Sequence, residues 1–185
     1  MKPSTKKPPP TTRSTTSKLS APATSPPGPS VPAKLSIELV PSTCWFSNLR
    51  SHLAPGDWDL VRKAAYMKAR HRCEACGGVG PKWPVECHEI WSYDDREKIQ
   101  RLDGVTALCP PCHQVKHIGL ASVHGRLAET SAHLARVNGW TRAETERYVR
   151  QSFSVWQERS LHSWRLDLSW LNPLGITVST ERGDS

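Results

Sequence analysis

The sequence lacks any run of about 20 consecutive apolar residues, so we expect no membrane-spanning helix and no membrane partner. Its N-terminus also lacks the apolar segment of a secretory signal peptide. Acidic residues are scarce at that end, because Glu38 is the only one among the first 40 residues. The first two absences argue against a membrane protein and a secreted protein, and we expect a cytoplasmic location.

Apolar residues are sparse in the first 34 positions, where Pro, Ser, Thr, Lys and Ala dominate. Such a segment buries too little apolar surface to offset the entropy lost on ordering, so we expect residues 1–34 to be disordered. Six Lys and Arg residues precede residue 41, and the whole chain carries a formal net charge of +8. A basic arm suits non-specific attraction to nucleic-acid phosphates, although a solvated linker would have the same composition.

The rest of the chain has the length of one ordinary domain with extra segments. Apolar residues alternate over 35–40, which predicts a strand, and recur at helical spacing over 57–70 and 120–137. A further helix should start at Thr141, where Thr141 and Glu144 form a capping box. We expect an α+β fold divided as follows: a strand and helix over 35–72, a central module over 73–118, helices and a strand at 166–171 within 119–179, and a frayed tail over 180–185.

Four of the six cysteines form two Cys-x-x-Cys pairs with 32 residues between them: Cys73, Cys76, Cys109 and Cys112. In a chain without a secretion signal, this pattern favours metal binding over disulfides. Two such pairs can place four thiolates in a tetrahedron, so we predict one structural Zn²⁺ that contributes on the order of 10 kcal/mol to folding. The alternative is two reduced or redox-active dithiols. Cys44 and Cys87 are expected to be buried apolar residues.

The stretch between and after the cysteine pairs is rich in histidine and glutamate. Residues 85–91 and 105–108 are predicted strands, and a short helix should begin near Pro111 and carry His113, Lys116 and His117. This order of strand, turn, strand and helix ends in Leu-Cys-Pro-Pro-Cys-His-Gln-Val-Lys-His. It resembles the HNH endonuclease family, which has a ββα-metal fold, over residues 70–118, about a quarter of the chain.

The resemblance implies a small zinc-stapled ββα-metal module with flanking helices and a disordered N-terminal arm. It also implies hydrolysis of DNA phosphodiester bonds, and a nucleic-acid partner that is DNA or, alternatively, RNA. By position, His88 and His113 would hold a catalytic divalent cation, Mg²⁺ or another, while Lys116 and His117 would contact nucleic acid.

The sequence departs from the family's pattern at two positions. Glu89 stands where the catalytic histidine is expected, and Gly104 stands where an asparagine braces the hairpin. Either Glu89 is the general base, or His88 is the base and Glu86 or Glu89 assists the metal. A carboxylate is a weaker base than an imidazole unless burial raises its pKa.

Three functions therefore compete. The sequence favours a metal-dependent HNH-like endonuclease. The missing asparagine favours a non-catalytic, zinc-containing nucleic-acid-binding module on the same scaffold. The third is a protein-interaction adaptor that uses the two late helices as its working surface.

Overall fold

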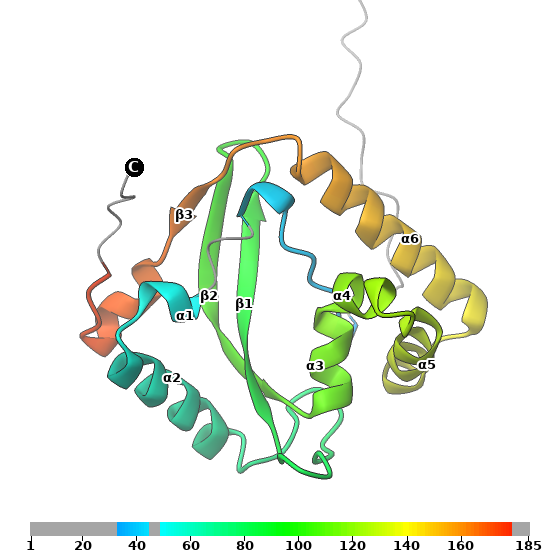
Figure 1. Cartoon of the computed structure of the whole chain (residues 1–185), viewed down its shortest axis with the longest axis horizontal. Helices are drawn as coiled ribbons and strands as arrows, with labels where there is room; N and C mark the ends of the chain where they lie inside the picture. The colour runs from blue at the N-terminus through cyan, green and yellow to red at the C-terminus, as the bar shows by residue number, and fades with distance from the viewer. Residues whose placement is uncertain (1–32, 45–48, 179–185) are drawn as a thin grey trace, which may run out of the picture.

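The computed structural model describes residues 33–44 and 49–178 (Figure 1). Almost all of the predicted disordered arm, and the predicted frayed tail, lie outside these residues. A long, twisted β-hairpin runs through the middle of the molecule, with helices on both sides. The predicted α+β class is confirmed. Within the described ranges, we find no helix with the length and apolarity that crossing a bilayer requires.

The sheet has three strands in the order β1-β2-β3. β1 (Glu86–Asp94) pairs antiparallel with β2 (Ile99–Leu108), and β3 (Arg165–Asp167) runs parallel to the start of β2. β1 ends three residues after the predicted 85–91, and β2 begins six residues before the predicted 105–108. The sequence did not predict these added residues because most of them are polar and show no apolar pattern. The register shifts between Ile90 and Trp91, a β-bulge that increases the local twist.

Helices α1 (Leu49–His52) and α2 (Pro55–Lys68) lie on one side of the hairpin. α2 begins two residues before the predicted Asp57, because proline suits the first turn of a helix. The 3-10 helix η2 (Ser169–Leu174) packs nearby and occupies the second half of the predicted strand at 166–171, while β3 covers its first two residues. The buried residues of this cluster are Leu49, Leu53, Val61, Leu102, Leu168, Leu171 and Ile176.

Four helices lie on the other side: α3 (Pro110–Lys116), α4 (Ile118–Val123), α5 (Leu127–Asn138) and α6 (Arg142–Arg159). The single helix predicted over 120–137 is wrong. The chain breaks at Gly125, whose φ of +71° lies in the left-handed region that glycine favours. The capping box of Thr141 and Glu144 is confirmed at the start of α6.

The strand predicted over 35–40 is also wrong, because this segment is extended but joins no sheet. It precedes the short 3-10 helix η1 (Ser42–Cys44) and lies against α3 and β1 instead. The Glu38 backbone amide donates to the Lys116 carbonyl at 3.3 Å, and Asn138 Oδ1 accepts from the Leu35 amide at 3.1 Å. This path brings Glu38 next to the residues that form the candidate site.

Candidate metal centres

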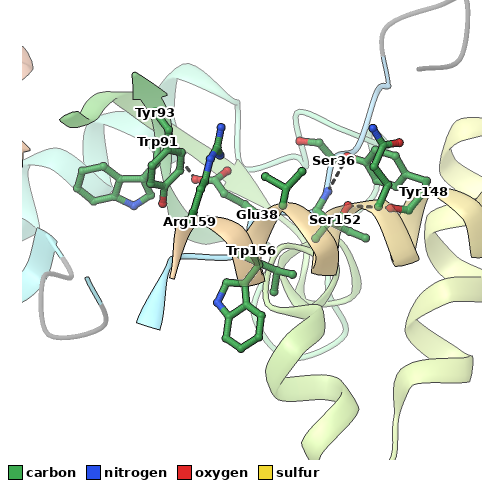
Figure 2. A pocket seen from close by; sticks show the side chains of 12 residues that line it. Ser36, Glu38, Trp91, Tyr93, Tyr148, Ser152, Trp156 and Arg159 are labelled. Atoms are coloured by element: carbon green, nitrogen blue, oxygen red, sulfur yellow. Dashed lines mark hydrogen bonds between the residues drawn. The ribbon is translucent and has the colours of Figure 1, made fainter. Parts of the chain in front are cut away.

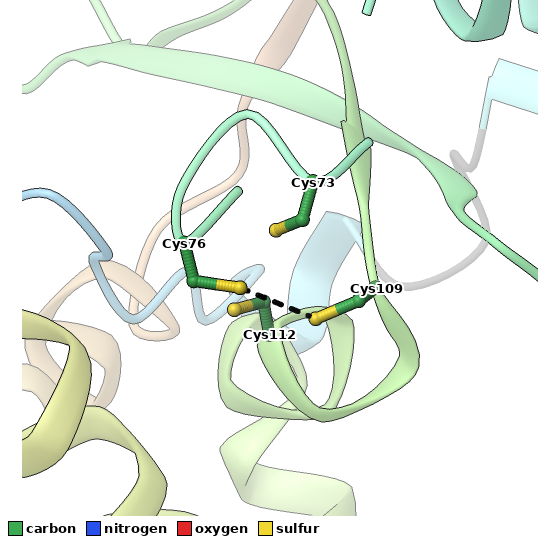
Figure 3. Close-up of side chains that lie close together, drawn as sticks. All are labelled: Cys73, Cys76, Cys109 and Cys112. Atoms are coloured by element: carbon green, nitrogen blue, oxygen red, sulfur yellow. Dashed lines mark hydrogen bonds between the residues drawn. The ribbon is translucent and has the colours of Figure 1, made fainter. Parts of the chain in front are cut away.

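The four paired cysteines meet where the turn that carries Cys73 and Cys76, here called the first cysteine knuckle, approaches the start of α3 (Figure 3). Their sulfurs all lie within 4.8 Å of one another. The Sγ atoms of Cys76 and Cys109 are 3.6 Å apart, close to the separation of about 3.8 Å that tetrahedral zinc with 2.3 Å bonds requires. The predicted cluster is thus confirmed as a site that can bind a metal ion such as zinc.

Local backbone geometry shapes the first cysteine knuckle. The Cys73 amide donates to the Gly78 carbonyl at 2.9 Å, and the Gly77 amide donates to the Cys73 carbonyl at 2.8 Å. Gly77 has a φ of +73°, which closes this tight turn. The Gly78 amide points at Cys76 Sγ from 3.4 Å, so it can stabilise a thiolate there.

The surrounding groups shift the pKa values of three of these thiols in different directions. A hydrogen bond from Cys112 lowers the pKa of Cys73 to about 4. Burial raises the pKa of Cys109 to about 11, and the hydrogen bond with Cys73 together with burial raises that of Cys112. Metal binding must therefore displace protons, and it must weaken as the pH falls.

His133, on α5, adds a contact that the sequence did not suggest. Its Nε2 lies 3.1 Å from Cys112 Sγ, and its Nδ1 lies 2.6 Å from an Arg136 nitrogen. The remaining two cysteines are outside the cluster. Cys44 is buried as predicted, whereas Cys87 is only half-buried, with a pKa raised to about 12 mainly by burial.

A second cluster gathers three histidines: His88 from β1, and His113 and His117 from α3 and its C-terminal cap. Their ligand atoms also lie within 4.8 Å of one another. The Nε2 atoms of His113 and His117 are 3.2 Å apart, and tetrahedral coordination at 2.0–2.1 Å requires about 3.3 Å between nitrogens. The expected metal pair of His88 and His113 is therefore brought together, and His117 joins it.

His88 supplies a further reason to consider a ligand here. It is 3% exposed, and neither ring nitrogen has a hydrogen-bond partner among the described residues. A buried polar group without a partner costs free energy, and a bound cation would remove that cost. The donor set fits a divalent transition metal. It does not favour the expected Mg²⁺, which prefers oxygen ligands, whereas imidazole suits zinc, nickel, copper and iron.

Glu86 orients one of the three imidazoles. Its Oε2 lies 2.6 Å from His113 Nδ1, so the proton of this imidazole belongs on Nδ1 and its Nε2 is free for a metal. Burial, followed by repulsion from His88, lowers the pKa of His113 despite Glu86. For His117 the largest cause is also desolvation by the surrounding protein atoms, although part of its ring stays exposed to solvent; repulsion from His88 and His113 adds to it, and together they lower its pKa to about 4. Both rings are thus neutral near pH 7, as metal binding requires.

Three residues expected to take part are placed differently. Successive strand residues face opposite sides, so Glu89 points away from the face of β1 that carries Glu86 and His88. Lys116 is 9% exposed and binds Ser36 Oγ at 2.9 Å, so it is not available to contact nucleic acid. It lies one turn after the buried Cys112, on the covered face of α3. His117 belongs to the histidine cluster, a role that its spacing from His113 could have revealed.

Gly104 pairs with Ile90 directly beside the bulge, with a φ of +156°. A β-carbon at Gly104 would meet the Trp170 ring at 3.7 Å, which is ordinary contact, so the backbone conformation is what favours glycine.

No family model, curated protein or solved structure matches the chain.

Proposed function

We propose that the protein is a metal-dependent HNH-like endonuclease that hydrolyses DNA phosphodiester bonds. The observation that carries this proposal is the convergence of His88, on the first strand of a hairpin, with His113 and His117, on the helix that follows. In this proposal the four cysteines hold a structural Zn²⁺ that fixes the start of α3. A cation at the histidines would stabilise negative charge on the scissile phosphate and the leaving oxygen, and would activate water.

The exposure of the cluster suits a large substrate. His88 is buried, but His113 retains 25% of its side-chain exposure, Glu86 retains 38%, and His117 is exposed. A phosphate group could therefore approach the solvent-accessible rings of His113 and His117, while the buried His88 would bind the cation from the side of β1. Glu86 keeps His113 in the tautomer that binds metal.

The alternative function is a nucleic-acid-binding module that does not cut. Two observations favour it. Glu89 occupies the position of the family's base but lies on the opposite face of β1 from His88. Gly104 leaves no side chain to orient a base.

Nicking of supercoiled plasmid by the full-length protein tests the proposal. The protein would be assayed with Ni²⁺, Mn²⁺ or Mg²⁺ beside His88→Ala and His113→Ala, with zinc content measured for each. His124→Ala is the matched control, because His124 is exposed on the surface beyond the cluster. We expect cation-dependent nicking by wild type and the control, and none by the cluster variants. Absence of nicking by folded, zinc-loaded wild type with every cation would favour the binding module.

A further inference from the structure

Glu38 reaches the histidine cluster from outside the hairpin and helix that supply the histidines. Its side chain is 11% exposed. Oε1 accepts a hydrogen bond from the Trp91 backbone amide at 2.9 Å, next to the β-bulge. Oε2 accepts from Lys116 Nζ at 3.2 Å and lies 3.6 Å from His88 Nε2. Figure 2 shows this carboxylate beside Trp91.

Stability alone does not account for this arrangement. Taking a carboxylate and an ammonium out of water carries a large desolvation cost, so a buried ion pair adds little net stability over apolar residues of similar size. The pair does hold Glu38 in one place. Lys116 and the Trp91 amide fix both oxygens, and the oxygen shared with Lys116 is the one that faces His88.

His88 has no other orienting partner among the residues that the structure describes. Glu86 contacts Nδ1 of His113, whereas no hydrogen bond holds either ring nitrogen of His88 in the part of the chain described. An imidazole that binds metal through one nitrogen usually donates its other N–H to a carboxylate or carbonyl, which fixes the tautomer. Glu38 is the carboxylate in position to accept from His88.

We propose that Glu38 is a positioning residue for the cation of the histidine cluster: it accepts the Nε2 proton of His88 and leaves Nδ1 to bind the metal. This inference rests on the proposed metal centre. It makes the extended segment 35–40 part of the site, with the Trp91 amide holding the carboxylate beside His88 even where Lys116 is replaced. Two carboxylates, Glu38 and Glu86, then orient the two inner histidines.

Glu38→Gln is the informative substitution because it keeps the shape of the side chain. The side chain also borders a pocket of about 320 Å³ between the extended segment, β1 and α6, so small shifts can be accommodated. Lys116→Met is the matched control. It breaks the same ion pair but leaves the carboxylate beside His88 and the Trp91 amide. If Glu38 serves only to pair with Lys116, both variants should behave alike.

Cation affinity would be measured by titrating the zinc-loaded, full-length proteins with Ni²⁺ or Co²⁺ and following the absorption of the bound ion. We expect Glu38→Gln to bind about 10- to 100-fold more weakly than wild type. We expect Lys116→Met to stay much closer to wild type. Equal losses in the two variants would overturn the inference, as would unchanged affinity in Glu38→Gln.

Nitrogen-15 NMR of the histidine rings gives a second readout that a structural role would not change. Wild type should show His88 protonated at Nε2, and Glu38→Gln should show a mixture of tautomers. Protonation of His88 at Nδ1 in wild type would contradict the inference. Neither readout uses DNA, so a protein that binds the cation as expected but never nicks plasmid would retain this inference and lose the nuclease proposal. A wild-type protein that binds no cation at the histidines would lose both.

Discussion

His113 and His117 face each other one helical turn apart, with their Nε2 atoms 3.2 Å apart. With the proton of His113 drawn to Glu86 at its Nδ1, the facing nitrogen is a free acceptor. Burial and the neighbouring rings also disfavour protonation of His117. Without a cation, His117 Nε2 can donate a hydrogen bond to this acceptor; with both rings protonated at Nδ1, the two facing lone pairs could instead bind a cation.

If His117 is a metal ligand rather than a phosphate contact, its removal should affect cation binding first. We expect His117→Ala to lower the affinity for Ni²⁺ at least about tenfold, because it removes one of three protein ligands. Binding of uncleaved DNA without added cation should keep the same salt dependence, since no phosphate contact is lost. A reduced salt slope with normal Ni²⁺ affinity would return His117 to the expected DNA-binding role.

The all-nitrogen donor set predicts a preference among cations. Ni²⁺ and Zn²⁺ should bind the histidine cluster far more tightly than Mg²⁺, because imidazole suits the first two and Mg²⁺ prefers oxygen. Calorimetric titration of zinc-loaded protein measures this directly, with His113→Ala as the control for binding elsewhere. Mg²⁺ affinity equal to that of Ni²⁺ would mean that oxygen ligands dominate the site.

The two glutamates of β1 should differ in their effect on nicking. Glu86→Gln should lower the rate about 10- to 100-fold by weakening the orientation of His113. Glu89→Gln should leave it nearly unchanged, because Glu89 lies on the other face of the strand. Strong loss in Glu89→Gln alone would instead make Glu89 the general base.

Acid should destabilise the fold partly through His117. Its pKa is about 4 in the folded protein against an ordinary value of 6.5, so the unfolded chain binds more protons between these values. Stability without added cation should therefore fall as the pH drops from 6.5 towards 4. His117→Asn cannot titrate, so guanidinium unfolding should show a smaller loss of stability in this variant. Equal losses would mean that His117 is not held neutral.

Zinc should be needed for the fold around α3. Cys109→Ser should lose bound zinc and much of the stability, on the order of several kcal/mol, because structural zinc contributes about 10 kcal/mol in small domains. Cys87→Ala is the matched control, since Cys87 lies outside the cluster. Metal analysis and thermal unfolding give the two readouts. Full zinc content and unchanged unfolding in Cys109→Ser would exclude the four-cysteine site.

The sequence was most informative where chemistry has a fixed spacing. The two Cys-x-x-Cys pairs predicted a cluster that the structure confirms, and the Thr141 and Glu144 capping box located the start of α6. Each Cys-x-x-Cys pair and the capping box is formed by residues within three positions of one another, so its own geometry does not depend on how distant parts of the chain pack.

Features that depend on distant packing were harder to predict. Residues 35–40 alternate like a strand, but no sheet edge receives them and they lie against α3. The sequence predicts a surface position for Lys116 because lysine is rarely buried, but Glu38 and Ser36 both pair with its ammonium group in the buried position. The contact between Glu38 and His88 could not be predicted at all, since 49 residues lie between them in the sequence.

The number of divalent cations bound per chain tests the central claim, that the protein holds two separate metal centres, most directly. Native mass spectrometry of wild type with Ni²⁺ added should show one zinc plus one nickel ion. His113→Ala should show the zinc alone, and His124→Ala should match wild type. A wild-type protein that binds only zinc, or a second ion that survives His113→Ala, would contradict the account.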